Sequence, residues 1–97
     1  MCYVYILYSE RLGKYYTGCT QYSPEQRLFQ HNDKHYDKSF TYSGIPWKMY
    51  YVISCENLAQ ARGIEQHIKR MKSKKYLENL RRYPELTEKL KALYKLP

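Results

Sequence analysis

Two tyrosines on short apolar stretches are the first residues of this chain that could do chemistry. Tyr5 lies in the apolar run 2–8, and Tyr16 lies in the run 15–20. A phenol on a rigid strand can pack within a sheet, or it can hold and transfer a proton. Each tyrosine alone is more often a sheet residue, so the interpretation depends on the groups that accompany the pair.

Three charged or titratable residues accompany them. Arg27 and His31 are four apart and so share one face of a predicted helix, and Glu65 lies on a second predicted helix. A guanidinium binds phosphate, a carboxylate binds a hard divalent cation, and an imidazole accepts protons near neutral pH. These three side chains are therefore candidates for binding an anion, a cation and a proton. The alternative is structural: a solvated helix face, and an ordinary Glu65–Lys69 pair at i+4.

The charge of the chain indicates a polyanionic partner. Its formal net charge is +8, and residues 49–97 carry eleven basic and five acidic side chains. Nucleic acid is the first expectation, an anionic membrane surface is the alternative, and a merely soluble basic surface is the structural reading. The densest basic run supplies the candidate nucleic-acid-binding residues: Lys69, Arg70, Lys72, Lys74 and Lys75. By default such a run is the solvated end of a helix, stabilised by the helix dipole.

Strands must position the two tyrosines. Run 2–8 is apolar on both faces, which predicts a central strand; run 15–20 predicts its hairpin partner, and 49–55 a third strand. Alternation places Tyr5 and Leu7 on one face of the first strand, with the even-numbered residues on the other.

Helices must position Arg27 and Glu65. The sequence Ser23–Pro24 predicts the start of a helix that ends near Asn32, and residues 33–48 read as irregular. Asn57 predicts a cap for a helix over 58–72. The apolar stripe expected to face the core in this helix consists of Ala61, Ile64, Ile68 and Met71.

Two further helices are expected at the C-terminal end. One covers roughly 75–83; Pro84 ends it and opens another, for which Leu86, Leu90 and Leu93 provide the packing face. The order β-β-α-β-α-α-α predicts an α/β (α+β) domain, a small three-stranded antiparallel sheet flanked by helices. The length predicts one domain over 1–97, with a motif-bearing core over about 2–80 and a helical extension over about 84–95.

The cysteines and the hydropathy indicate the expected cellular compartment. No run of 18 or more apolar residues predicts a membrane span. Cys2, Cys19 and Cys55 form no CxxC pair, so we expect free thiols in a cytoplasmic protein. The cysteines with His31, His35 or His67 could be considered as a zinc site, but their spacing matches no standard one.

These parts, in this order, resemble the GIY-YIG nuclease domain. The resemblance is carried by Tyr3-Val4-Tyr5, Tyr16-Thr17-Gly18, the Arg27-x-x-x-His31 spacing and a helical Glu65. More narrowly, the chain is similar to small stand-alone GIY-YIG proteins of bacteria. The resemblance implies a three-stranded antiparallel sheet and the hydrolysis of DNA phosphodiester bonds with one divalent ion, Mg²⁺ or Mn²⁺.

The resemblance also implies roles. Tyr5 and Tyr16 become the motif tyrosines, Arg27 the phosphate clamp, His31 an auxiliary base, and Glu65 the metal ligand. A nearby cation favours the phenolate, so Arg27 or the metal could make either tyrosine a usable base. All four principal side chains, those of Tyr5, Tyr16, Arg27 and Glu65, should then meet at one cleft.

The sequence departs from the family pattern at Tyr3, Thr17 and Cys19, where glycine, isoleucine and, in some members, lysine are usual. A catalytically weak or inactive nucleic-acid-binding module of the same fold is therefore the alternative function. A protein-interaction or membrane-surface domain that uses the C-terminal helices ranks below it, because no helix combines an apolar face with Trp or Phe anchors. The sequence indicates no membrane partner and no obligate protein partner.

Overall fold

Three antiparallel strands form the centre of the protein. The structure is a computed structural model that describes residues 1–33 and 40–95 of the chain. Strands β1 (Cys2–Ser9), β2 (Lys14–Thr20) and β3 (Trp47–Cys55) pair in the order β2-β1-β3. The apolar character of both faces of β1 is explained by this order, because β1 lies between the other two strands and both of its faces are covered. The predicted central strand is confirmed.

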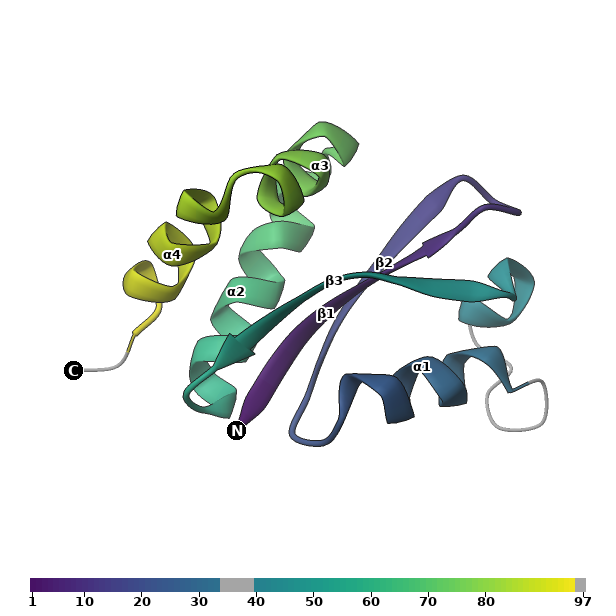
Figure 1. Cartoon of the computed structure of the whole chain (residues 1–97), viewed down its shortest axis with the longest axis horizontal. Coiled ribbons are helices and arrows are strands. Elements are labelled where there is room, and N and C mark those ends of the chain that lie inside the picture. The colour runs from purple at the N-terminus through teal and green to yellow at the C-terminus, as the bar shows by residue number, and fades with distance from the viewer. Residues whose placement is uncertain (34–39, 96–97) are drawn as a thin grey trace.

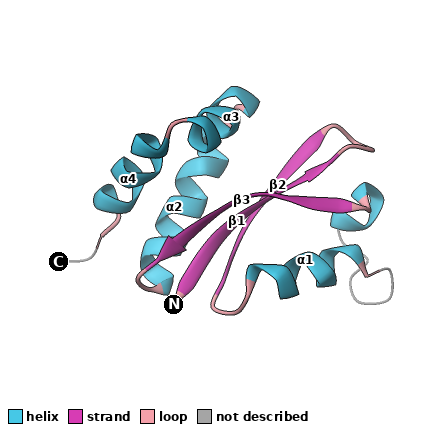
Figure 2. Cartoon of the chain, in the orientation of Figure 1, coloured by secondary structure: helices cyan, strands magenta, loops and turns pink. Residues whose placement is uncertain are grey.

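Helices cover both faces of the twisted sheet (Figure 1). Helix α1 (Pro24–Asn32) packs on one face, which we call the α1 face. Helices α2 (Leu58–Met71), α3 (Lys74–Arg82) and α4 (Pro84–Leu93) lie on the other side, whose sheet surface we call the α2 face. Figure 2 shows that strand and helix account for most of the described chain. The predicted three-stranded antiparallel α/β fold is confirmed.

Alternation along β1 divides the core in two. On the α2 face, Val4 and Ile6 pack with Ile64 of α2 and Leu80 of α3. On the α1 face, a smaller cluster is formed by Tyr5, Leu7 and Trp47, with Leu28 of α1 packed against it. Within the described residues, no helix has both the length and the apolar character that crossing a membrane requires.

Side-chain caps fix where two helices begin. The Ser23 hydroxyl accepts a hydrogen bond from the Gln26 amide at 3.1 Å, and Asn57 Oδ1 accepts one from the Gln60 amide at 2.8 Å. Each bond satisfies an amide that has no partner within the first turn. Both predicted helix starts are confirmed.

Two apolar side chains at helix ends are exposed, although the sequence predicted that they would be packed. Met71 was expected in the core but is 45% exposed, and Leu93 was expected to pack but is 65% exposed. Met71 is the last residue of α2, and at Lys72 the backbone turns left-handed with φ 47°, so the chain leaves before another element can cover Met71. Leu93 likewise ends α4.

The connection predicted as irregular is shorter than 33–48. Residues 34–39 lie outside the described residues, Phe40–Gly44 form a short 3-10 helix, and β3 already begins at Trp47. A β-bulge interrupts the pairing of β3, since Ile6 pairs with Tyr51 and Leu7 pairs with Met49. The extra residue, Tyr50, packs beside Tyr51 on the α2 face.

Candidate active site

Tyr5 occupies the centre of the α1 face. Its side chain is 1% exposed, and its hydroxyl is 3.0 Å from Nε2 of His31. The Arg27 Nε donates a second hydrogen bond to the same hydroxyl oxygen at 3.3 Å. Because Arg27 can only donate, the hydroxyl proton of Tyr5 remains available for the imidazole. Tyr5 of β1 thus shares one hydrogen-bonded cluster with Arg27 and His31 of α1.

Helix α1 brings two members of this cluster to the sheet. Arg27 and His31 are one turn apart, as the sequence predicts, and His31 is buried at 5% exposure while Arg27 is half-buried. The guanidinium also donates from Nη1 to the Gln30 amide oxygen. Gln30 therefore restrains the orientation of Arg27, which is a role that the sequence analysis missed.

Tyr16 completes the cluster from β2. Its ring centroid lies 4.7 Å from that of His31, 6.3 Å from that of Tyr5 and 6.3 Å from that of Trp47. The imidazole is thus packed against a phenol ring within a largely aromatic wall. Trp47 lies in the segment 33–48 that the sequence analysis read as irregular, and burial to 2% exposure gives it a structural part here.

A second contact missed from the sequence fixes α1 to β3. Asn32 Nδ2 donates to the Trp47 carbonyl at 3.0 Å, and Asn32 Oδ1 accepts from the Trp47 amide at 2.6 Å. This two-bond bracket holds the end of α1, and with it His31, against the start of β3. An asparagine at a helix end gives little warning of such a contact, because the partner is defined only by the tertiary fold.

The electrostatics of Tyr5 differ from the sequence-based expectation. Burial raises the pKa of the Tyr5 phenol above its ordinary value of 10.0, and the Arg27 hydrogen bond and charge lower it by less. We expected a neighbouring cation to favour the phenolate. In the folded protein desolvation outweighs the cation, so Tyr5 is a neutral phenol that can relay a proton rather than a ready anion.

Glu65 lies on the opposite face of the sheet. It projects from α2, its side chain is 12% exposed, and its Oε1 accepts a hydrogen bond from the Cys19 thiol at 3.6 Å. Its Oε2 is 3.2 Å from the Lys69 ammonium, the pair expected at i+4. The structure therefore brings Tyr5, Tyr16, Arg27 and His31 together on the α1 face and places Glu65 across the sheet.

The edge strand β2 contacts both parts of the candidate site, the Tyr5 cluster on the α1 face and Glu65 on the α2 face. Tyr5 pairs with Gly18, and a β-carbon built at Gly18 would lie 2.6 Å from the Tyr5 hydroxyl, so this hydroxyl lies over the glycine. The next residue, Cys19, points to the α2 face and contacts Glu65. The Tyr5 phenol and the Glu65 carboxylate thus lie on opposite sides of β2. The phenol lies at Gly18, and the carboxylate lies at the next residue, Cys19.

The donor set near Glu65 suits a hydrated hard cation. Among residues 1–33 and 40–95, no three His, Cys, Asp or Glu side chains gather as a metal cluster. Mg²⁺ retains several waters and is often held by one or two carboxylates, so a single glutamate fits it. Within this part of the chain no three ligands lie close enough for the zinc site considered from the sequence, and His35 lies outside it.

The basic run lies beyond Glu65, at the junction of α2 and α3. Lys69, Lys72 and Lys74 line a cavity of about 490 Å³ with Lys14 of β2. Lys75 is exposed, and Arg70 donates to the Tyr94 hydroxyl at 3.3 Å. Three of the five candidate nucleic-acid-binding residues therefore share one hollow, and the other two lie outside it.

A family model supports the resemblance that the motifs suggest. The model described as the GIY-YIG catalytic domain matches residues 1–78 of the 97-residue chain. The matched span contains all three strands, α1, α2 and the first half of α3, and it ends before α4. No curated protein and no solved structure matches the chain significantly.

Proposed function

Because this chain belongs to the GIY-YIG catalytic domain family and has its nuclease-type fold, we propose that it is a metal-dependent endonuclease that hydrolyses DNA phosphodiester bonds. The observation that carries the proposal is the Tyr5–Arg27–His31 cluster beside Gly18. It couples a phosphate-binding cation to a proton-transfer pair within a few ångströms.

Arg27 is the proposed phosphate clamp. It is the half-buried member of the cluster, whereas Tyr5 and His31 are buried. A phosphate that binds the guanidinium competes with the Tyr5 hydroxyl for the same N–H donors. Binding of the substrate would therefore draw Arg27 outward and uncover the Tyr5 hydroxyl.

Tyr5 and His31 are the proposed proton-transfer pair. The Tyr5 hydroxyl can take a proton from the attacking water while it passes its own proton to Nε2 of His31, 3.0 Å away. This route avoids a free phenolate, which burial disfavours. Tyr16, packed on the imidazole, holds the water or a phosphate oxygen by a hydrogen bond.

Glu65 is the proposed ligand of the divalent ion, Mg²⁺ or Mn²⁺. When bound there, the ion offsets the negative charge that develops on the phosphate. The carboxylate must then release Lys69, which pairs with it at 3.2 Å. A phosphate that engages both halves of the site would lie along the edge of β2, between Arg27 and Glu65.

The proposed substrate follows from the charge and the family. A basic chain of net charge +8 suits a polyanion, and the exposed lysines of α2 and α3 suit the DNA backbone. The cytoplasm is the compartment in which the free thiols of Cys2, Cys19 and Cys55 would persist.

Plasmid nicking with Mn²⁺ tests the catalytic assignment. The wild-type domain should convert supercoiled plasmid to the open circle, and Glu65→Gln, which keeps the side-chain shape, should slow nicking by about 10²-fold or more. The matched control is Glu56→Gln, which changes an exposed carboxylate that lies two residues before the start of α2. Equal nicking by wild type and Glu65→Gln would contradict the assignment.

The alternative is a binding module that shares the fold but does not cleave DNA. The departures at Tyr3, Thr17 and Cys19 favour it. In that case no variant nicks above background, while DNA binding persists and weakens as salt rises, because displaced counterions drive the association.

A further inference from the structure

A cavity on the α2 face borders the proposed catalytic cluster and shares Tyr16 with it. It has a volume of about 490 Å³, within the roughly 300–1,000 Å³ of small-molecule sites. Strand β2 forms one side and the α2–α3 junction forms the other. The lining residues are Lys14, Tyr15, Tyr16, Thr17, Ile68, Lys69, Lys72, Ser73, Lys74 and Leu77.

The charged residues that line this cavity are all cationic. Its lining contains four lysines and no carboxylate. Lys69 pairs with Glu65, and Lys74 donates to the Gly13 carbonyl at 2.8 Å, so both are held in place. The positive end of the α3 dipole also points here, since Lys74 is the first residue of that helix. The cavity is therefore suited to an anion.

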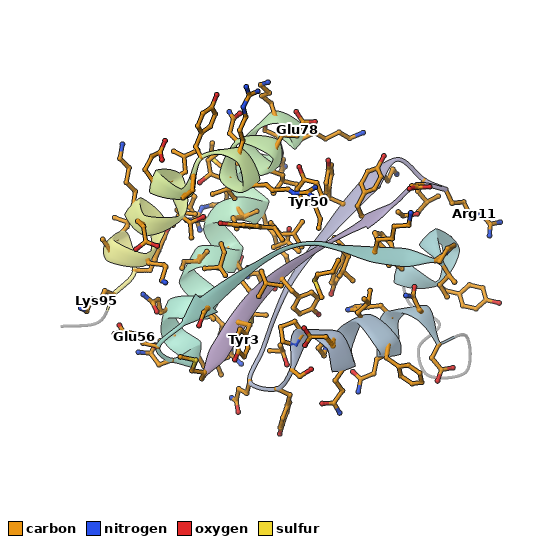
Figure 3. The ribbon with its side chains drawn as sticks, viewed as in Figure 1. Tyr3, Arg11, Tyr50, Glu56, Glu78 and Lys95 are labelled. Atoms are coloured by element: carbon orange, nitrogen blue, oxygen red, sulfur yellow. The ribbon has the colours of Figure 1, made fainter. Side chains whose placement is uncertain are left out.

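The remaining lining is mostly apolar or aromatic, and Thr17 and Ser73 are its polar members. The Tyr15 ring contacts two other rings, with centroids 4.8 Å away at Tyr8 and 4.9 Å away at Tyr50. In Figure 3, Tyr50 lies on the side of the sheet that faces α3, from which Arg81 covers its ring at 4.6 Å. Tyr15 and Leu77 both line the cavity, and aromatic and aliphatic walls of this kind suit a planar ring rather than an anion alone.

We propose that this cavity binds a nucleoside phosphate whose base is unpaired, with the base against Tyr15 and Leu77 and the phosphate among the lysines. Cationic donors beside aromatic and aliphatic walls match the two halves of a nucleotide, as in single-strand binding sites. A paired base is stacked within a duplex and cannot enter such a hollow. The proposal deepens the proposed function and rests on it, since Tyr16 and Lys69 link the cavity to the catalytic site.

Binding of small ligands without metal tests the proposal. The full chain, labelled with ¹⁵N and held in EDTA, is titrated with dAMP, deoxyadenosine and inorganic phosphate in turn. We expect dAMP to bind at least about tenfold more tightly than either fragment, because both halves of the cavity contribute. Amide shifts should concentrate in 14–17 and 68–77. Equal affinities for dAMP and phosphate would overturn the proposal.

Two double variants that remove the same charge distinguish binding in the cavity from the general electrostatic attraction of a basic protein. Lys14→Gln with Lys72→Asn removes two cavity lysines; asparagine is chosen at 72 because it tolerates the left-handed backbone. Lys89→Gln with Lys95→Gln removes two exposed lysines that do not line the cavity. We expect the first to weaken dAMP binding about tenfold and the second less than about twofold. Equal weakening by folded variants would overturn the proposal.

A competition experiment identifies the source of the nucleotide. If a strand supplies it, a short single-stranded oligonucleotide should displace dAMP from the 14–17 amides, and a closed hairpin duplex should not. If neither displaces dAMP, the ligand is a free nucleotide. Because no step needs metal or cleavage, these results are independent of whether Glu65→Gln abolishes nicking.

Discussion

The Tyr5 hydroxyl lies over the backbone of Gly18, its partner across the β1–β2 ladder. A β-carbon at position 18 would approach that oxygen to 2.6 Å, which is closer than packed atoms allow. Glycine is thus required here by the space that Tyr5 occupies. The same ring position sets the hydrogen bonds to His31 and Arg27, so Gly18 controls the geometry of the proposed site without contributing a side chain.

Gly18→Ala should therefore destabilise the fold and disturb the cluster together. We expect a loss of about 1–3 kcal/mol in the free energy of unfolding, measured with urea, because the ring must move. In a Tyr5→Leu background the same substitution should cost much less, since the hydroxyl is gone. An equal loss of stability in both backgrounds would show that the contact with Tyr5 is not the reason for glycine at position 18.

Tyr15 should make stability depend on pH. Burial, then its hydrogen bond to Tyr50, raises the Tyr15 pKa from 10.0 to about 12. Above pH 10 the unfolded chain loses this proton first, so the stabilisation present below pH 10 is lost as pH rises toward 12. Nearby Glu78 and Tyr8 act in the same direction.

Urea unfolding between pH 8 and 11 checks this expectation. Tyr15→Phe should be less stable than wild type at pH 8 by about 1 kcal/mol, from the lost hydrogen bond. The difference should shrink as pH rises, because phenylalanine does not ionise. Tyr22→Phe, at a 70% exposed position, is the control and should show a constant difference. A pH-independent difference for Tyr15→Phe would contradict the assignment.

The sheet and the helix starts could be predicted because local signals determine them. A strand with two apolar faces must be central, and Ser23 and Asn57 cap their helices whatever packs on them. Met71 and Leu93 were misplaced because periodicity continues to the last residue of a helix, whereas burial depends on where the next element goes. The bulge at Tyr50 leaves no signal in residue type.

Within the candidate site, the shared helix face of Arg27 and His31 was predictable, and the geometry was less so. Spacing placed Arg27 and His31 on one helix face, and that face meets Tyr5. No sequence pattern states which face of the sheet a later helix will cover, so the position of Glu65 across β2 emerges only from the fold. The burial that raises the Tyr5 pKa is likewise a tertiary property.

Lys69 should compete with a divalent cation for Glu65. Its ammonium lies 3.2 Å from Oε2, so a metal must displace it. Lys69→Met should tighten Mn²⁺ binding about two- to fivefold, the range of a partly exposed ion pair, as measured by the loss of free Mn²⁺ signal in electron paramagnetic resonance. Lys75→Met removes the same charge outside ion-pair distance and should change the affinity less. Equal tightening in both variants would indicate a general field effect.

Cys19 should report on the state of Glu65. Burial, then the Glu65 carboxylate, raises the pKa of the Cys19 thiol above 9.0, so little thiolate forms at pH 8 and alkylation is slow. Glu65→Gln removes the negative charge at the 3.6 Å contact and should speed iodoacetamide labelling of Cys19 several-fold, resolved by peptide mass spectrometry.

Mn²⁺ should have the same effect on the wild-type chain and none on Glu65→Gln, because only the native carboxylate both raises the thiol pKa and binds the cation. Cys55 serves as an internal control, since it is buried away from Glu65 on β3 and its labelling should not respond to either change. If Mn²⁺ left Cys19 labelling unchanged while still supporting nicking, the ion would have to bind elsewhere than at Glu65.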